Sequence, residues 1–551
     1  PLPFMPVVMW GTGDIERLLD MGFTHDMRHF GNLAETWEIG APVNERGRSE
    51  TVGAVETLNR HMLAGLRVCL TTRPGTWVNR TRTENEFKRV DRSGTPNNPD
   101  NAAVAHPRIQ QFGYNLGAGI AQTYGHFPNF DAALIHSEVR DSTSMSFHDY
   151  EVASAREYLN GKDIPRLAQS KGGVSYKAIP DFPVSRIIPD DYDLLRFYTW
   201  FWKVGDGWNP LHSRVHHGLK STGRHDLWTF FDPAVRAPSV WGSGGEVDVI
   251  SQWTYSYPDP IKIGQATDEL FAMAEGVPGQ KVMKMTQIIW YRSRTAPELP
   301  ADEKDRVAWE KEIPDAKFIT ISPDHLSETL WSMIARPVRG IMYHGWGSLV
   351  TAPHTSYRFT NPDTPPRLKK LTSEVIKPLG PTLLQIPDRK ADIAILESFS
   401  SQVFAGRGSN GWSGSWEADV HLMLQWASLQ PQVVYEETIR KNGLGQYKVL
   451  VMPNCDVLTE SVVKEIHAFQ RRGGIVVADE RLCPGIMADI LIPVRARTSK
   501  PDVDKAALQQ MAANLLDELL PFYQRHFWTD NADLVPRMRQ FGDSEYLFII
   551  N

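Results

Sequence analysis

The chain has 551 residues, which is too long for one hydrophobic core, so we expect two or three domains. A hydrophobic content of 41% and a charged content of 23% are typical of a soluble globular protein. The formal net charge of -6 gives no sign of a nucleic-acid partner, and no apolar stretch is long enough to predict a membrane span. Aromatic residues are in excess, with 17 Trp, 16 Tyr and 23 Phe, which indicates a large aromatic core, stacking on sugar rings, or both.

Cysteine spacing argues against a metal site and against a disulfide framework. Cys69, Cys455 and Cys483 lie far apart and have no metal-ligand spacing. Cys455 also lacks the Gly-flanked turn of a nucleophilic thiol, so we expect no chemistry at this residue. We also expect no cofactor and no metal. The chain begins with Pro1, so we expect that it has been processed and that any signal peptide is out of view.

Eight apolar runs alternate with helical stretches through residues 1–360. The runs are residues 6–10, 23–30, 66–71, 132–135 (within the stretch 130–141), 225–232, 246–255, 281–290 and 340–346. Helices are predicted at residues 14–21, 49–64, 106–124, 190–219, 263–274 and 322–335. Eight strands that alternate with helices predict a (β/α)8 barrel. The polar segment 73–105 is longer than an ordinary connection; it is either a solvated loop or a site for an anionic group such as a sulfate or uronate.

A second alternation of strands and helices follows a Pro-rich stretch, residues 361–390, that we expect to be a linker with a helix at 367–376. Apolar runs at 393–397, 432–435, 448–452 and 475–479 are each followed by a helical stretch. This pattern predicts a doubly wound, flavodoxin-like α/β domain at 391–535. The last run, YLFIIN at 546–551, has no partner in view, and we expect residues 536–551 to open a truncated C-terminal β domain.

Polar and aromatic side chains stand at the ends of the eight barrel strands, where such barrels carry their reacting groups. The candidates are Asp26, Arg28, Arg73, His136, Glu138, Asp232, Trp253, Tyr255, Gln287, Trp290, His344 and Trp346. Glu138 follows a fully apolar run, and a carboxylate there is costly unless it is paired with a cation or used in a reaction. For the aromatic and histidine candidates the alternatives are core packing and contact with a sugar.

The pattern resembles the clan of retaining glycoside hydrolases with a (β/α)8 barrel, and within it the family 42 β-galactosidases. Those enzymes add a flavodoxin-like domain and then a small β domain. The stretch DVISQWTYSYPDP, which starts at Asp248, resembles their aromatic-rich sixth strand, and IMYHGW, which starts at Ile341, resembles a strand that ends in a Trp platform. The resemblance implies that Glu138 is the general acid/base and that Arg28 lies near the nucleophile position.

Two residues depart from the pattern of that clan. Ser137 stands where Asn usually precedes the acid/base, and Gln287 stands where the nucleophile Glu is expected. An amide cannot supply the carboxylate of a double displacement. Either a Glu has been replaced in this chain, or the mechanism uses another carboxylate, with Asp232 and Asp248 as candidate bases, or the strand register differs, or the protein is not catalytic.

We therefore expect an exo-acting, β-galactosidase-like glycoside hydrolase. The alternatives are a carbohydrate-binding protein on a degenerate scaffold and, less directly, a lyase or transferase on the same barrel. The expected partner is a carbohydrate, with no nucleic acid and no membrane. From the related enzymes we expect a homo-oligomer, a trimer or dimer, and substrate logic favours a periplasmic or secreted location over a cytoplasmic one.

Overall fold

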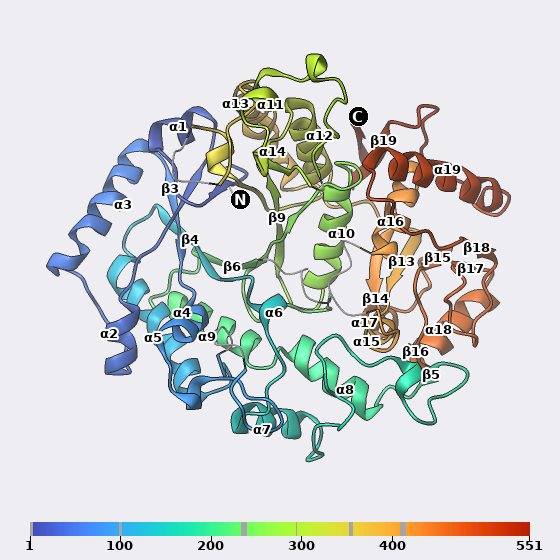
Figure 1. Cartoon of the computed structure of the whole chain (residues 1–551), viewed down its shortest axis with the longest axis horizontal. Helices are drawn as coiled ribbons and strands as arrows, with labels where there is room; N and C mark the ends of the chain where they lie inside the picture. The colour runs from blue at the N-terminus through green and yellow to red at the C-terminus, as the bar shows by residue number, and fades with distance from the viewer. Residues whose placement is uncertain are drawn as a thin grey trace.

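A closed barrel of eight parallel strands forms the centre of the molecule (Figure 1). The computed structural model describes residues 4–97, 102–232, 238, 240–293, 295–351, 356–407 and 415–551. Round the barrel the strands are β1 (Val7–Trp10), β2 (His25–Arg28), β3 (Arg67–Thr71), β4 (Phe130–Ser137), β6 (Trp228–Asp232), β7 (Val249–Ile250), β9 (Lys281–Gln287) and β12 (Gly340–His344), which closes on β1. The predicted sixth strand is in two pieces, β7 and β8 (Trp253–Thr254), and both pair with β9. The predicted (β/α)8 barrel is confirmed.

Alternation along the strands separates the barrel interior from the helix layer. Met27, Leu134, Met285 and Met342 belong to one buried cluster that fills the inside of the barrel. Their neighbours on the same strands, such as Ile135, pack outward in a second cluster against the helices. Successive side chains of a strand point to opposite faces, so the apolar runs supply both layers at once.

The outer layer contains most of the predicted helices. They are α1 (Ile15–Asp20), α3 (Val52–Ala64), α5 (Pro107–Tyr124), α10 (Lys262–Ala274) and α12 (Pro323–Ile334). The predicted helix at 190–219 is wrong in one respect, since it is broken into α8 (Asp193–Thr199), a π-helical turn (Trp200–Val204) and α9 (Trp208–Lys220). Gly205 and Gly207 take positive φ values of 93° and 88° at the break, and a Cβ on Gly207 would lie 2.7 Å from the backbone N of Ala105.

Packed structure is present in residues 361–390 and in residues 73–105. Residues 361–390 hold α13 (Thr364–Leu371), a π-helical stretch (Thr372–Ile376) and α14 (Lys377–Leu383), and the Thr372 hydroxyl donates to the Met21 carbonyl at 2.8 Å. The helix that we expected at 367–376 is therefore present, and this hydrogen bond fastens the helical segment to the barrel. Within 73–105, Arg89 is fully buried and pairs with Asp206 at 2.6 Å, so this arginine is not available to an anionic ligand.

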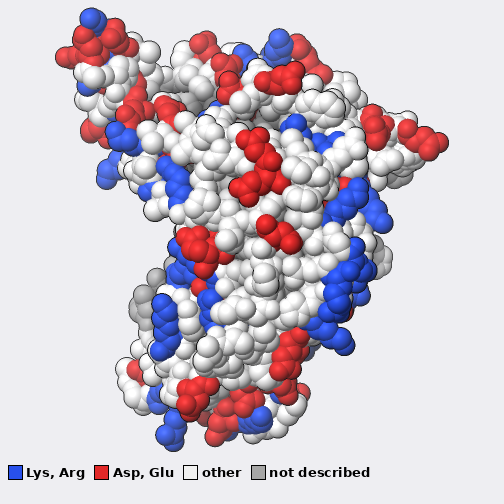
Figure 2. Space-filling view, turned by 90° about the vertical axis from the view of Figure 1, so that its right-hand side faces the viewer, with Lys and Arg blue, Asp and Glu red and all other residues white. Residues whose placement is uncertain are grey.

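The second α/β unit has a five-stranded parallel sheet in the flavodoxin-like order β14-β13-β15-β17-β18. Its strands are β13 (Ile393–Glu397), β14 (Gln432–Tyr435), β15 (Val449–Met452), β17 (Ile475–Ala478) and β18 (Ile490–Leu491). Its helices are α15 (Phe399–Phe404), α16 (Trp416–Trp426), α17 (Glu436–Asn442), α18 (Glu460–Arg471) and α19 (Pro501–Leu519). Separate buried clusters cover the two faces of the sheet, so the predicted doubly wound fold is confirmed. The side of the molecule that carries this unit shows acidic and basic side chains interspersed (Figure 2).

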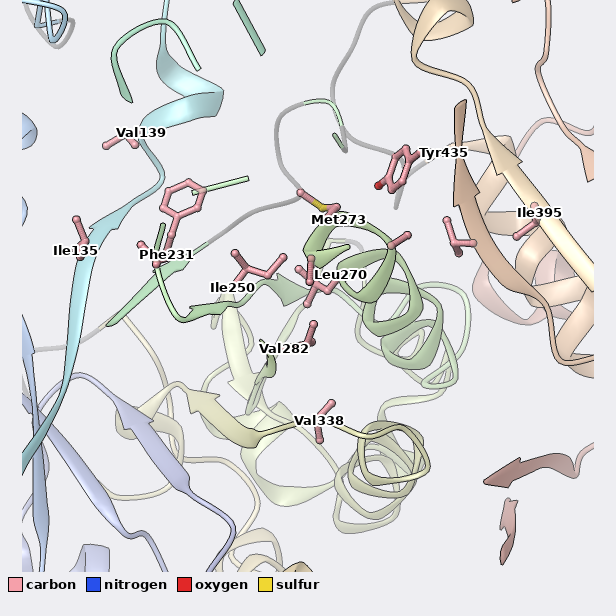
Figure 3. Packing of buried hydrophobic residues seen from close by; sticks show 14 of the residues in the cluster. Ile135, Val139, Phe231, Ile250, Leu270, Met273, Val282, Val338, Ile395 and Tyr435 are labelled. Carbon is pink, nitrogen blue, oxygen red and sulfur yellow. The ribbon is translucent and has the colours of Figure 1, made fainter. Parts of the chain in front are cut away.

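Helix α10 lies between the barrel and the second sheet and joins them through one apolar cluster (Figure 3). Leu270 and Met273 of α10 belong to the same cluster as Val282 of β9 and Ile395 of β13. The short strand β5 (Ile187–Ile188), from the segment between β4 and β6, also pairs with β16 (Leu458–Thr459) of the second unit.

The last residues form a two-stranded antiparallel hairpin of β19 (Val535–Phe541) and β20 (Ser544–Ile550). The expectation that 546–551 is a strand without a partner is wrong, because β19 pairs with it along its whole length. Arg539 of β19 is fully buried and donates to the carbonyls of Ile334 at 3.1 Å and Leu383 at 2.6 Å, which fastens the hairpin to the barrel helices. Across the described residues, no helix combines the length and the apolar character that crossing a bilayer requires.

Candidate functional site

The end of β4 delivers Glu138 to the carboxyl-terminal mouth of the barrel through an irregular backbone. The β4–β6 register shifts between Leu134 and Ser137, and Glu138 then takes a left-handed conformation with φ of 59° before the short helix α6 (Val139–Ser142). The Glu138 N–H donates to the Asp232 carbonyl at 3.2 Å, so the two acidic residues leave adjacent strands side by side. Bulges and left-handed non-glycine residues re-aim side chains and concentrate at functional sites.

Arg73 supplies a cation beside these two carboxylates. It follows β3, also takes a left-handed conformation with φ of 50°, and donates its N–H to the Ile135 carbonyl at 2.8 Å. Burial lowers the pKa of Arg73, while the negative charges of Glu138 and Asp232 act in the opposite direction. The guanidinium stands 5.9 Å from the ring centre of Trp10, at the end of β1. An acid, a second carboxylate and a cation thus meet at one edge of the mouth.

Gln287 and His344 end two neighbouring strands on the other side of the mouth, where the β9–β12 register pairs them directly. Gln287 is 8% exposed, and its Oε1 accepts no hydrogen bond from any described residue. Burial lowers the pKa of His344 to about 4, which keeps the ring neutral at pH 7. The Nδ1 of His344 also has no hydrogen-bond partner among the described residues. Each of these two side chains therefore carries a buried polar atom that no described residue satisfies.

Aromatic rings form a continuous wall beside Gln287 and His344. Trp253 meets Tyr255 edge to face at 5.1 Å between ring centres, and the Tyr255 hydroxyl donates to that of Tyr291 at 3.0 Å. Phe318 lies against both Tyr291 and Tyr357, and Tyr357 is 5.4 Å from the His344 ring. Rings with hydroxyl groups suit sugar recognition, because their faces cover C–H surface while the hydroxyls bond to polar groups.

Sequence reasoning did not select Trp10, Tyr291 or Tyr357. Trp10 ends the first apolar run and could have been found by the same rule as the other strand ends. Tyr291 and Tyr357 follow β9 and β12 at a distance, and only the pairing of β10 (Ile289–Tyr291) with β11 (Phe318–Thr320) aligns their rings. No sequence signal marks them.

Several predicted site residues lie elsewhere. Asp26 is fully buried in the helix layer, with His61 of α3 at 2.9 Å and the Arg28 Nε at 2.7 Å. His136 is fully buried, accepts from the Gly75 N–H at 2.8 Å, and has its pKa lowered well below the usual value by burial. Both side chains are engaged in holding the fold.

The aromatic candidates Trp290 and Trp346 also differ from the ring wall. Trp290 packs edge to face on His325 of α12 at 5.1 Å, within the helix layer. Trp346 begins a 3-10 turn and packs against the buried cluster beneath β1 and β12. Both indole rings are partly buried in these contacts.

Asp248 is excluded as the second carboxylate by its position. It precedes β7, at the amino-terminal end of the barrel, and binds Lys220 at 2.7 Å and the Thr229 N–H at 2.8 Å. Asp232 ends β6 and lies at the opposite end of the barrel, at the mouth. The predicted runs already placed Asp232 at the end of one strand and Asp248 near the start of the next, and the structure agrees.

The described part of this mouth contains neither a metal cluster nor a reactive thiol. Among the described residues, no group of three His, Cys, Asp or Glu side chains is placed to hold a metal ion. Cys455 is fully buried after β15, and burial raises the pKa of its thiol well above the usual range.

Several solved structures share this architecture. No protein-family model and no curated protein matches the chain. The fold is that of the GH42 beta-galactosidases. The beta-galactosidase from Bacillus circulans sp. alkalophilus has a TM-score of 0.64 at 12% identity, with coverage of 99% of this chain and 93% of that one. A GH42 beta-galactosidase from G. stearothermophilus gives 0.59 at 14%, covering 99% and 92%.

An apo exo-carrageenase GH42 from Bacteroides ovatus has a TM-score of 0.54 at 11% identity, covering 98% of this chain and 74% of that one. All three likenesses extend over nearly the whole chain, so they describe the barrel and the second unit together. At such low identities they establish the shared fold, and the chemistry has to be argued from the residues of this chain.

Proposed function

We propose that the protein is a glycoside hydrolase that acts at the carboxyl-terminal mouth of the barrel, with Glu138 as the proton donor. The observation that carries the proposal is the meeting of Glu138, Asp232 and Arg73 opposite Gln287, beside a wall of aromatic rings. Glycosidic cleavage needs an acid for the leaving oxygen and a second carboxylate for the water or the anomeric carbon. An exo-acting, β-galactosidase-like specificity is the finer form of this proposal, and the shared fold supports it.

Asp232 is the second carboxylate in this proposal, and Gln287 is a substrate-binding amide. Had a glutamate been replaced at 287, groups that stabilise an ionised carboxylate should surround it. Instead, Arg28 directs its guanidinium to Asp26 and to the Gly13 carbonyl. Asp232 lies at the mouth, near Glu138 and Arg73. This arrangement favours an altered mechanism over a replaced nucleophile.

Glu138→Gln tests the role of the proton donor. With a natural oligosaccharide, we expect kcat to fall by about 10²–10⁴-fold, because the leaving oxygen must be protonated. With an aryl glycoside whose phenol leaves without a proton, the loss should be much smaller. Glu303→Gln, an exposed glutamate in the loop after β10, is the matched control and should keep full activity. Equal, small losses on both substrates would refute the role of Glu138.

Asp232→Asn and Gln287→Glu test the second carboxylate, with NMR detection of the first anomer released. We expect Asp232→Asn to abolish hydrolysis and Gln287→Glu to leave it unchanged or lower it, since a second negative charge disturbs the mouth. A gain of several orders of magnitude in Gln287→Glu, with retention of configuration, would instead identify a replaced nucleophile and remove Asp232 from the mechanism.

A carbohydrate-binding protein without catalysis is the second candidate, and the amide at Gln287 favours it. The aromatic wall would bind a glycan whether or not the reaction proceeds. Binding on a glycan array, with no product from wild type or Gln287→Glu, would support this candidate over the hydrolase.

A further inference from the structure

The amino-terminal end of the barrel holds a second cavity, of about 720 Å³, at the opposite end from the proposed reaction site. Its lining comes from the starts of the strands: His25 begins β2, Arg67 begins β3, Trp228 begins β6 and Lys281 begins β9. Arg339, directly before β12, completes the ring. This end of such barrels ordinarily contributes to stability, so an open polar cavity there needs its own explanation.

The carboxylates of the cavity are already neutralised. Each of the three has a cation at ion-pair distance: Asp131 with Arg67 at 2.5 Å, Asp226 with Arg224 at 2.8 Å, and Asp248 with Lys220 at 2.7 Å. The Oδ1 of Asp131 also lies 3.0 Å from the Nε2 of His25. The acidic side chains of the lining therefore do not need Lys281 or Arg339.

Two cationic side chains of the lining, Lys281 and Arg339, are not paired with these carboxylates, and they lie next to each other. The β9–β12 register pairs Met283 with Gly340, so Lys281 and Arg339 leave the same edge of two adjacent strands. Neither side chain has a hydrogen bond or ion pair with any described residue. Arg339 is half-buried, and burial lowers its pKa. A half-buried guanidinium without an anion is costly, and its planar donors match a carboxylate, sulfate or phosphate.

Much of the remaining wall of the cavity is apolar. Trp228 is half-buried and meets His25 edge to face at 6.0 Å, and Met283, Val249 and Leu384 line the space with it. An indole face beside two cations suits a molecule with a ring or apolar body and one anionic group. Inorganic ions alone would leave most of this volume and the apolar surface uncovered.

We propose that this cavity is a second binding site, which takes a small molecule with a phosphate, sulfate or carboxylate group held by Arg339 and Lys281 and a ring or apolar body against Trp228. The site is separate from the proposed reaction, and it stands whether or not the protein hydrolyses glycosides.

Ligand-detected NMR and thermal shift on the full chain test the site with five probes: inorganic phosphate, sulfate, glucose 6-phosphate, glucuronate and neutral glucose. We expect an anionic sugar to bind more tightly than the inorganic ions, and glucose to show no binding here. Arg339→Gln should weaken binding at least about tenfold, Lys281→Gln should weaken it to a smaller degree, and added salt should weaken it further. Comparison of the phosphate, sulfate and carboxylate probes identifies the preferred anion.

Lys441→Gln, which removes one exposed positive charge on α17 of the second unit, is the matched control and should bind like wild type. Arg339→Lys keeps the charge and should recover part of the affinity. If Arg339→Gln does not fold, Lys281→Gln and Arg339→Lys carry the comparison. The proposal is overturned if no anionic probe binds below about 10 mM, or if the cavity variants bind as wild type does. Trp228→Leu with unchanged affinity for the anionic sugars would overturn the ring-binding part.

Discussion

Asp268 on α10 is the centre of a buried ionic network that joins the barrel to the second unit and to the terminal hairpin. Its oxygens lie 2.8 Å and 2.9 Å from the Arg336 guanidinium, 3.1 Å from Arg537 of β19, and 3.2 Å from His421 of α16. Arg336 is 1% exposed and Arg537 is 5% exposed. Asp268→Asn keeps the shape of the side chain and removes the charge that both guanidiniums need.

We expect Asp268→Asn to lower the free energy of unfolding by about 3–5 kcal/mol, the range for breaking a buried ion pair from one side. Arg537 retains Asp388 at 2.7 Å, so most of the loss belongs to Arg336. Urea unfolding measures the effect, with the slope m compared between variants, because separate unfolding of the two units would change it. Asp226→Asn, whose ion pair with Arg224 is exposed on the carboxylate side, is the control and should cost less than about 1 kcal/mol.

The pH dependence of this variant follows from the direction of the shift. Burial opposes ionisation of Asp268, but Arg336 and Arg537 outweigh it and hold the pKa of Asp268 below its usual value. A carboxyl group whose pKa is depressed in the folded state stabilises the fold at pH values above its pKa in the unfolded chain. This stabilisation is lost as the pH falls through the pKa of the folded state. The difference between wild type and Asp268→Asn should therefore persist at neutral pH and shrink only in strong acid. A loss at pH 7 no larger than that of Asp226→Asn would refute the reasoning.

Three further predictions concern buried groups elsewhere. Burial and the neighbouring Asp259 raise the pKa of Glu328 to about 8, so wild type should lose stability as the pH rises from about 4.5 to 8, and Glu328→Gln should remove that slope in urea titrations. Burial lowers the pKa of Lys284 to about 7, so the free energy of unfolding should rise between about pH 7 and 10.5. Lys284→Met should flatten this rise, and an unchanged pH profile in this variant would contradict the prediction. Arg539→Met should leave the carbonyls of Ile334 and Leu383 without their donor, cost about 2–4 kcal/mol and expose the hairpin to limited proteolysis; resistance equal to wild type would argue against this anchoring role.

The sequence alone determined the eight barrel strands in chain order and four of the five strands of the second sheet, whereas β18 was not predicted. Runs such as 130–137 and 393–397 are buried on both faces, which requires continuous apolar residues, and helical stretches between them force parallel pairing. Glu138, Gln287 and His344 were found by one rule, since each ends an apolar run at the carboxyl edge. That rule needs only a strand boundary and no knowledge of packing.

Tertiary structure decided which of the strand-end side chains face the mouth. A shift of one residue turns a side chain to the other face of a strand, and Asp26 accordingly lies in the helix layer. In β4, beyond the register shift, His136 lies against Gly75 and Glu138 is at the mouth. The aromatic wall of Tyr291 and Tyr357 depends on segments that meet only in the fold. The cavity around Arg339 has the same origin, because it forms only when the starts of eight strands close into a ring.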